Sequence, residues 1–339
     1  FFYLHCTVVE TQMTLHEIRV METVRSCGCK GIRSCLLCET KHKIVKPNLK
    51  THFEKCSSYV YCPNCDKSWP GWDADLYKNH PYHRGTAIEF PGVYIKLDFL
   101  NPWEINSLKN ALEKIPWEVS QSGRRKQNFG PKCNFKKRKL RLGSFDGFPK
   151  STQFVQQKFC EVPMLNNFQT IEQCTLEYDP LRGASIDPHI DDCWIWGERI
   201  VTVNVMGNSV LTMSPYHGPD TKYNLESVAE YSTILEGFEF DTNDKNESNK
   251  DTIVRLPMPE GSLMVLYDSA RQENFLTDMA KYYTIILIVR YKWEHCVLRE
   301  DITSKRICLA YRELTPPYLG TSTNNEIVKE LLKRASVFQ

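Results

Sequence analysis

Three side chains that bind metals stand out by type and spacing. His189 and Asp191 are separated by one residue, and His295 lies in the β-prone run 291–298. In an extended segment, residues two apart share one face with α-carbons about 6.6 Å apart, so both side chains can reach one ion. Two histidines and one carboxylate occupy one face of an octahedral ferrous ion and leave the other face open for substrates and oxygen. We therefore predict an iron site formed by His189, Asp191 and His295.

A histidine and an aspartate two positions apart also occur by chance, so the prediction needs further support. A pair of arginines downstream provides it. The run Arg306–Arg312 alternates as a strand, which places both arginines on one face with Cys308 and Ala310. Two guanidinium groups inside a β-structure are costly unless carboxylates pair with them through bidentate hydrogen bonds. A dicarboxylate cosubstrate would meet this requirement. The alternatives are a surface histidine near a helix cap and an arginine pair at a solvent-facing sheet edge.

A second group of metal-binding residues lies nearer the N-terminus, where seven of the 14 cysteines fall between Cys27 and Cys65. One set predicts a zinc site and consists of Cys27, Cys29, Cys35 and Cys38. Another is close to a Cys2His2 pattern and consists of Cys62, Cys65, His80 and His83, with Cys56 and His52 as substitute ligands. Free thiols in a flexible loop are the alternative.

The chain is long enough for one large domain or for one domain with a small appendage. The chain has 339 residues, 41% hydrophobic and 25% charged, which is enough apolar surface to offset the entropy of folding. This excludes a peptide hormone, a collagen and a disordered tail. The formal net charge of +2 is too small to draw the whole molecule to polyanions.

The N-terminal sequence and the hydropathy of the chain predict its cellular compartment. No apolar leader precedes the cysteines, which favours reduced thiols in the cytoplasm and nucleus over extracellular disulfides. The longest apolar stretch, Tyr282–Val289, has eight residues and predicts no membrane contact, since about 18–20 are needed to cross a bilayer. Because the sequence begins with Phe1, we expect residues 1–20 to be an unstructured leader and Met21 to be a plausible start.

The elements that must position the site are short. Asn101 followed by Pro102 predicts a helix to about residue 114, after a strand at 92–100. Further helices are expected at 151–161 and 325–338. The β-prone runs are 170–178, 199–206, 252–256, 262–267, 291–298 and 305–313. This order predicts an α+β fold with a jelly-roll body, divided into a leader at 1–20, a Cys/His-rich segment at 21–85, the main domain at 86–320 and a C-terminal helix at 321–339.

One segment is strongly basic. Nine of the eighteen residues from Arg124 to Arg141 are lysine or arginine, and none is acidic. Phe129 and Phe135 lie among these cations, a mixture that suits phosphates, bases or an acidic protein surface. The alternative is a solvated loop.

Taken together, these residues resemble the AlkB-type iron(II)- and 2-oxoglutarate-dependent dioxygenases over about residues 21–339. The longer motifs resemble the fourth-homologue branch of this family, and they are Cys27-Gly-Cys29-Lys-Gly-Ile-Arg33-Ser-Cys35-x-x-Cys38-Glu39, Ser120-Gln-Ser-Gly-Arg124-Arg-Lys-Gln127, Gly130-Pro-Lys132 and Asp187-Pro-His189-Ile-Asp191-Asp192-x-Trp194-x-Trp196-Gly-Glu198-Arg199. The resemblance implies a double-stranded β-helix that binds ferrous iron, 2-oxoglutarate and oxygen.

The resemblance also assigns roles to the cosubstrate residues. Arg306 would bind the distal carboxylate of 2-oxoglutarate, Arg312 would lie beside its metal-binding end, and Tyr178 would match the family tyrosine that hydrogen-bonds it. The chain departs from the family pattern at three positions, where relatives often carry Asn or Thr, and these are Leu176, Cys308 and Ala310. A further departure is the stretch 272–290 before Trp293, which we expect to be an insertion that forms a surface loop or an edge strand.

For the activity, the resemblance implies oxidative removal of N-methyl groups. The substrates associated with the fourth-homologue branch are a methylated lysine of actin, within actomyosin, and N6-methyladenine in DNA. The near-neutral charge favours a protein substrate, although residues 124–141 would also suit DNA. A non-catalytic module that binds actin or chromatin, with a vestigial iron site, is the third hypothesis.

Overall fold

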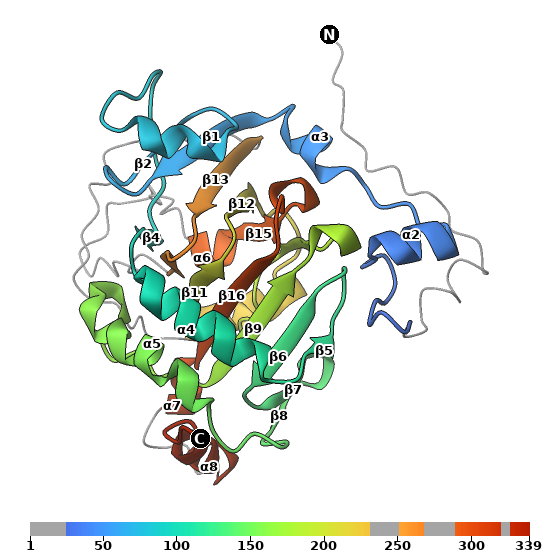
Figure 1. The fold of residues 1–339 in the computed structure, drawn as a ribbon, viewed down its shortest axis with the longest axis vertical. Helices are drawn as coiled ribbons and strands as arrows, with labels where there is room; N and C mark the ends of the chain where they lie inside the picture. The colour runs from blue at the N-terminus through green and yellow to red at the C-terminus, as the bar shows by residue number, and fades with distance from the viewer. Residues whose placement is uncertain (1–24, 231–250, 268–288, 320–325) are drawn as a thin grey trace, which may run out of the picture.

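Two seven-stranded sheets pack face to face and form the body of the molecule (Figure 1). The computed structural model describes residues 25–230, 251–267, 289–319 and 326–339. The predicted leader at 1–20 lies outside these residues, as does the predicted insertion except for its last two residues, which open α6 (Val289–Lys292). No helix within the described ranges is both long and apolar enough to span a membrane.

The first sheet contains the strands that carry the two histidines. Its order is β10 (Ile186–His189), β15 (Trp293–Val297), β12 (Ser209–Pro215), β13 (Thr252–Met258), β1 (Ser57–Cys62), β2 (Lys67–Pro70) and β3 (Ile88–Glu89). Neighbouring strands run antiparallel, except that β1 pairs with β13 in parallel.

The second sheet carries the two arginines. Its order is β4 (Val93–Lys96), β14 (Leu263–Leu266), β11 (Trp196–Met206), β16 (Arg306–Leu314), β9 (Glu172–Tyr178), β6 (Arg125–Phe129) and β5 (Glu118–Val119). All its neighbours are antiparallel, and a separate hairpin is formed by β7 (Lys132–Asn134) and β8 (Lys139–Arg141). From β9 to β11 the chain alternates between the two sheets, and β14, β15 and β16 alternate again, which confirms the predicted jelly-roll architecture.

Helices cover the outer face of the second sheet. They are α4 (Pro102–Glu113) and α5 (Gln153–Gln157), while α2 (Leu36–His42), α3 (Leu49–Phe53), α7 (Pro316–Leu319) and α8 (Glu326–Arg334) lie elsewhere (Figure 1). The predicted capping of α4 is confirmed, because the Asn101 side chain accepts from the Glu104 amide and the Glu104 carboxylate accepts from the Asn101 amide.

Two hydrophobic cores result from the alternation of side chains along the strands. On β16, Ile307, Leu309 and Tyr311 face the helices and pack with Leu108 and Leu112 of α4. The intervening residues of β16 face the space between the sheets, where Cys308 joins a second core. The arginines at both ends of β16 therefore point into the molecule, as the alternation predicted.

The structure differs from the sequence-based elements at several places. Residues 57–70, where no β-prone run was predicted, form β1 and β2 because their aromatic and apolar side chains pack against the sheet core. The start of the basic segment forms β6, which pairs with β9. The helix predicted at 151–161 is a single α-helical turn at 153–157 flanked by tighter turns.

Candidate iron and cosubstrate site

The two histidines face each other across neighbouring strands. His189 at the end of β10 is the register partner of His295 in β15, and the two ring centroids are 4.3 Å apart. Asp191 follows two residues after His189. The ligand atoms of His189, Asp191 and His295 all lie within 4.8 Å of one another.

This spacing fits a single metal ion. Three atoms that are at most 4.8 Å apart share a point within about 2.8 Å of each, close to the ~2.0–2.2 Å of metal bonds to nitrogen and oxygen. A small adjustment of side chains would bring all three into bonding distance. The structure thus brings together the three side chains that the sequence singled out, although residues 272–290 intervene before His295.

Hydrogen bonding leaves one oxygen of Asp191 without a partner. Its Oδ1 accepts from Arg312 at 3.1 Å, whereas Oδ2 is buried and has no hydrogen-bond partner among the described residues. A buried carboxylate oxygen without a partner is costly. Burial raises the pKa of the Asp191 carboxyl. The charges of Arg312 and of the two imidazoles lower it by more than burial raises it, so the pKa lies well below its ordinary value. An ionised carboxylate oxygen that lacks a partner and lies near two imidazoles fits a divalent cation.

The histidines are held in the neutral form that binds metals. Burial lowers the pKa of His189 and lowers that of His295 still further below the ordinary value of 6.5. The Nδ1 of His189 lies 2.9 Å from the carbonyl oxygen of Asp187, to which it can donate a proton. That hydrogen bond fixes the tautomer and leaves Nε2 to face the ion.

Arg306 and Tyr178 lie side by side at the predicted cosubstrate position. They are register partners on β16 and β9, and the Arg306 guanidinium stands 4.8 Å from the centre of the Tyr178 ring. Arg306 is 1% exposed and donates from Nε to Asn204 at 2.9 Å. No carboxylate of the described residues lies within ion-pair distance of it. A buried guanidinium without a counter-charge is the feature that a dicarboxylate would satisfy.

Arg312 has a different environment from Arg306. It pairs with Glu172 at 2.6 Å, its register partner on β9, and with Asp191 at 3.1 Å. These two carboxylates already supply its counter-charge. Arg312 is therefore placed to orient Asp191, a contact that sequence spacing did not predict.

Between the two arginines the inner face is apolar. The three residues that depart from the family pattern line it, because Cys308 is the register partner of Leu176 and Ala310 follows on the same strand. The surface offers few polar contacts to a bound keto acid, so the arginines and Tyr178 must provide most of them.

Besides Glu172, two residues that support the site were not predicted from the sequence. Arg290, the last residue of the predicted insertion, is 3% exposed and donates to the carbonyl oxygens of Asp191, Trp196 and Gly197. Asn204 positions Arg306. No short-range signal identifies either residue, since both act through contacts across about 90 residues or more of chain.

The other predicted residues also come together. The sulfur atoms of Cys27, Cys29, Cys35 and Cys38 lie within 4.8 Å of one another, and so do the ligand atoms of Cys62, Cys65, His80 and His83. Neither group includes the predicted substitutes, Cys56 and His52. In the basic segment, Arg125 pairs with the buried Glu177, and Arg138 pairs with Glu226.

Comparison with known proteins identifies the family. A Mus musculus protein named "Alpha-ketoglutarate-dependent dioxygenase alkB homolog 4" is 35% identical over 319 residues, covering 93% of this chain and 96% of that protein. The chain belongs to the alkB homolog 4 family of α-ketoglutarate-dependent dioxygenases. The Homo sapiens protein of the same name is 32% identical over 330 residues, covering 94% of the dioxygenase described here and 96% of the human protein. α-Ketoglutarate is 2-oxoglutarate, the predicted cosubstrate.

Other matches to the dioxygenase are more distant. A Caenorhabditis elegans protein named "DNA N6-methyl adenine demethylase" is 29% identical over 303 residues, covering 85% of the chain and 87% of that protein. Among solved structures, a 2OG-Fe(II) oxygenase family oxidoreductase from Burkholderia pseudomallei has a TM-score of 0.36 and 10% identity, covering 65% of the dioxygenase and 83% of that chain. No family model matches the sequence.

Replacing Arg312 by methionine is expected to weaken ferrous iron binding by about 10–100-fold, the usual effect of removing a partner that orients a metal ligand. Without the Arg312 guanidinium, the Asp191 carboxylate loses the hydrogen bond that orients it and a positive charge that stabilises its ionised form. An anaerobic titration of the apoprotein with ferrous iron measures this effect. Arg334→Met, which removes a partly exposed arginine paired with Glu330, is the control. Equal affinities in the two variants would contradict the role of Arg312.

The apoprotein is expected to lose stability as the pH falls below about 6.5. Both His pKa values are lowered in the folded state, so the unfolded chain takes up protons first, at the ordinary pKa of 6.5. Each imidazole then contributes a slope of at most about 1.4 kcal/mol per pH unit. The lowered pKa of Asp191 acts only below its ordinary 3.8, outside this window. Urea unfolding between pH 5 and 7 should show a shallower dependence in His189→Gln, and identical slopes would refute the assignment.

Proposed function

We propose that the dioxygenase oxidatively removes N-methyl groups, and that its substrate is a methylated lysine of a protein such as actin. The observation that carries the proposal is the convergence of His189, Asp191 and His295 in a fold that also buries Arg306 with no carboxylate partner among the described residues. Bound ferrous iron with 2-oxoglutarate and oxygen would supply the oxidising power, converting 2-oxoglutarate to succinate and carbon dioxide. The hydroxylated methyl group then leaves as formaldehyde.

The residues of the chain have separate tasks in this reaction. His189, Asp191 and His295 would hold the ion on one face and leave the other positions open. Arg306 would bind the distal carboxylate of 2-oxoglutarate through a charge-assisted hydrogen bond, with Tyr178 beside it. The apolar face formed by Leu176 and Cys308 keeps water away from the cosubstrate, which strengthens these interactions.

A lysine-binding arrangement on the outer face of β15 offers a second contact for a protein substrate. The ammonium group of Lys222 lies 5.2 Å and 4.6 Å from the ring centres of Tyr216 and Tyr223, and 3.2 Å from the carboxylate of Glu294. Aromatic faces with a nearby carboxylate attract ammonium and methylammonium groups. Glu294 precedes the ligand His295 in β15, so its side chain points to the face of the strand opposite the iron site. Because Lys222 is 52% exposed, an ammonium group from a substrate has access to the same surface.

The charge distribution also favours a protein. Two arginines of the basic segment, Arg125 and Arg138, are engaged by Glu177 and Glu226, which reduces the positive field available to a phosphate backbone. The net charge of +2 points in the same direction. Such a substrate is consistent with an enzyme of the cytoplasm and nucleus.

DNA is the second candidate substrate. The Caenorhabditis elegans relative is named for N6-methyladenine demethylation. In the β7–β8 hairpin, Phe135 is 47% exposed, and within the described structure none of the surrounding lysines forms an ion pair, namely Lys132, Lys136, Lys137 and Lys139. An exposed ring among cations suits a base and its phosphates.

Succinate formation tests the proposal. Purified protein with ferrous iron and 2-oxoglutarate is supplied with lysine-methylated actin or N6-methyladenine DNA, and each unmethylated form serves as its control. We expect succinate and formaldehyde in equal amounts with methylated actin. Preferential turnover of DNA would establish the second candidate. No substrate-dependent succinate under any condition would leave only a non-catalytic binding module.

The lysine-binding arrangement has its own test. Glu294→Gln removes the negative charge but keeps the shape, so it should raise the KM for a lysine-methylated protein substrate about 10-fold, because a hydrogen bond to a charged group contributes about 1.5–3 kcal/mol. The KM for 2-oxoglutarate should not change. Glu260→Gln, which alters a carboxylate bound to the Gly207 amide, is the matched control.

A further inference from the structure

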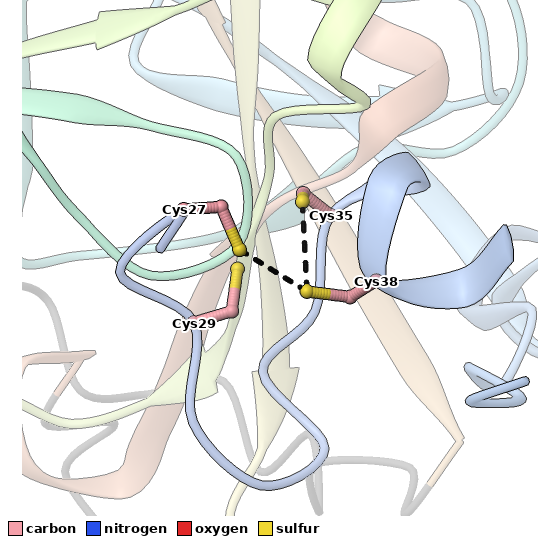
Figure 2. A group of neighbouring side chains, drawn as sticks. All are labelled: Cys27, Cys29, Cys35 and Cys38. Carbon is pink, nitrogen blue, oxygen red and sulfur yellow. Dashed lines mark hydrogen bonds between the residues drawn. The ribbon is translucent and has the colours of Figure 1, made fainter. Parts of the chain in front are cut away.

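Four cysteines converge at the edge of the dioxygenase body, and we propose that they hold a structural zinc ion. Figure 2 shows their thiols pointing toward one another, two from the turn Cys27–Cys29 and two from the start of α2. The group is separate from the iron site. The ligand type, thiolate only, is the one that zinc prefers in closed structural sites.

The sulfur positions fit a tetrahedral ion. Cys27 and Cys38 have sulfur atoms 3.2 Å apart, and those of Cys35 and Cys38 are 3.8 Å apart. Zinc–sulfur bonds of about 2.3 Å place the ligand sulfurs about 3.8 Å apart in a tetrahedron. Disulfide sulfurs are about 2.05 Å apart, and all four cysteines here are free.

No large hydrophobic core accounts for the burial of these thiols. Cys29, Cys35 and Cys38 are 0%, 3% and 1% exposed, and among the described residues Ile44 is the only apolar side chain besides the cysteines themselves that joins their cluster. This is too small a core to hold the segment 25–47 in place. Zinc binding provides the missing free energy, because metal affinity adds directly to the stability of a small closed site.

A glycine allows the uncommon Cys-x-Cys spacing. Gly28 has φ of +81°, which lets the chain turn sharply so that Cys27 and Cys29 face the same point. A Cβ atom at this position would approach the backbone of Ser120 to 3.1 Å. The turn therefore packs directly on the loop that leads into β6.

The zinc segment also contacts the residues that support His189. Glu39, next to Cys38, accepts from both terminal nitrogens of Arg299, and Arg299 donates to the Gly183 carbonyl at 3.1 Å. Lys46 pairs with Asp187 at 2.7 Å. The carbonyl of Asp187 is the one that lies 2.9 Å from Nδ1 of His189.

Through these contacts, the proposed zinc ion would help to position His189. Loss of zinc would release the segment 25–47, and with it the contacts of Lys46 with β10 and of Glu39 with Arg299, which binds the turn before β10. His189 would then lose part of its support, and ferrous affinity would fall. This coupling rests on the proposed iron site, whereas zinc occupancy does not depend on it.

A different set of residues supports a second zinc site independently. Cys62 ends β1, Cys65 follows in the turn, and His80 and His83 come from the next loop, with all ligand atoms within 4.8 Å of one another. The Nε2 atom of His83 is buried and has no hydrogen-bond partner among the described residues. The indole of Trp69 donates to the Cys65 sulfur at 3.5 Å and stacks on His83. An orphaned imidazole nitrogen beside two thiols fits a Cys2His2 zinc site.

Metal analysis of the full chain tests both sites. Protein expressed with zinc and iron in the medium is purified without chelator, and its zinc content is measured by mass spectrometry. We expect two zinc ions per chain in the wild type and in Cys160→Ser, which removes an exposed cysteine outside both groups. Cys35→Ser should retain one zinc ion and should bind ferrous iron about 10-fold more weakly. Cys65→Ser should also retain one zinc ion, with its iron affinity unchanged.

Several results would overturn the inference. A folded wild-type protein with no zinc, or with disulfides among these cysteines, contradicts both sites. Unchanged zinc content in Cys35→Ser contradicts the four-cysteine site, and in Cys65→Ser it contradicts the Cys2His2 site. If either variant does not fold, a mercurial thiol reagent is added to the native wild type, and two zinc ions per chain should be released. Release of fewer than two would refute the proposal of two zinc sites. Normal zinc with no iron binding would contradict the proposed function alone.

Discussion

Replacing Arg306 by methionine is expected to raise the 2-oxoglutarate concentration needed for half-maximal turnover by about 100-fold or more. Removing one partner of a buried ion pair typically costs about 3–5 kcal/mol, because the other charge is left uncompensated. In the proposed function that charge is the distal carboxylate of the cosubstrate. Leu176 and Cys308 offer it no replacement hydrogen bond.

The same variant is expected to keep its fold in the absence of cosubstrate. Arg306 is buried with an amide, a thioether and a ring as its neighbours, and within the described structure it has no carboxylate partner. Replacing a buried unpaired cation with an apolar side chain of similar length removes a desolvation cost. The thermal midpoint of the cosubstrate-free protein should therefore remain within a few degrees of the wild-type value.

Thermal unfolding with increasing 2-oxoglutarate separates the two effects. Wild-type protein with a redox-inert divalent metal should gain stability with each addition, since the ligand binds only the folded state. Arg306→Met should gain almost none. Arg138→Met, which removes a half-exposed arginine paired with Glu226, should respond like the wild type. A normal 2-oxoglutarate response in Arg306→Met would refute the role assigned to Arg306.

The second large effect concerns the carboxylate of the triad. Asp191→Asn should lower turnover by more than about 100-fold, the upper end of the loss seen when even an indirect partner of a metal ligand is removed. An amide has nearly the same shape, but it lacks the charge that Arg312 and a ferrous ion both require. Because Arg312 still has Glu172, the variant should fold.

The neighbouring aspartate provides a matched control. Asp192 accepts from Asn224 at 2.9 Å and does not belong to the group of ligand atoms, so Asp192→Asn should retain turnover within about 10-fold. Turnover of both variants is measured as succinate at saturating 2-oxoglutarate. If the two substitutions reduce turnover equally, Asp191 has no special role.

Much of the site could be predicted from the sequence because it depends on local strand geometry. The alternation of β16 alone places Arg306 and Arg312 on the inner face, and the two-residue spacing of His189 and Asp191 brings both toward one point. The capping signal at Asn101 predicted the start of α4 for the same reason. Each of these inferences uses residues only a few positions apart in the chain.

The parts that were missed depend on contacts between distant segments. β1 pairs with β13 in parallel across almost 200 residues, and no local pattern specifies that partner. Likewise, Arg290 donates to the carbonyl of Asp191, and Glu172 meets Arg312 only once β9 and β16 are in register. The basic segment illustrates the same limit, because the carboxylate that engages Arg125 belongs to β9.

The most direct test of the account is an anaerobic titration of the apoprotein with ferrous iron and 2-oxoglutarate, followed by visible charge-transfer absorption. The account predicts a band that saturates at one ferrous ion per chain, requires 2-oxoglutarate, and is absent in His189→Ala and His295→Ala. A band of equal strength in either variant, or no band in the wild type at saturating ligand, would contradict the claim that these side chains form the iron site.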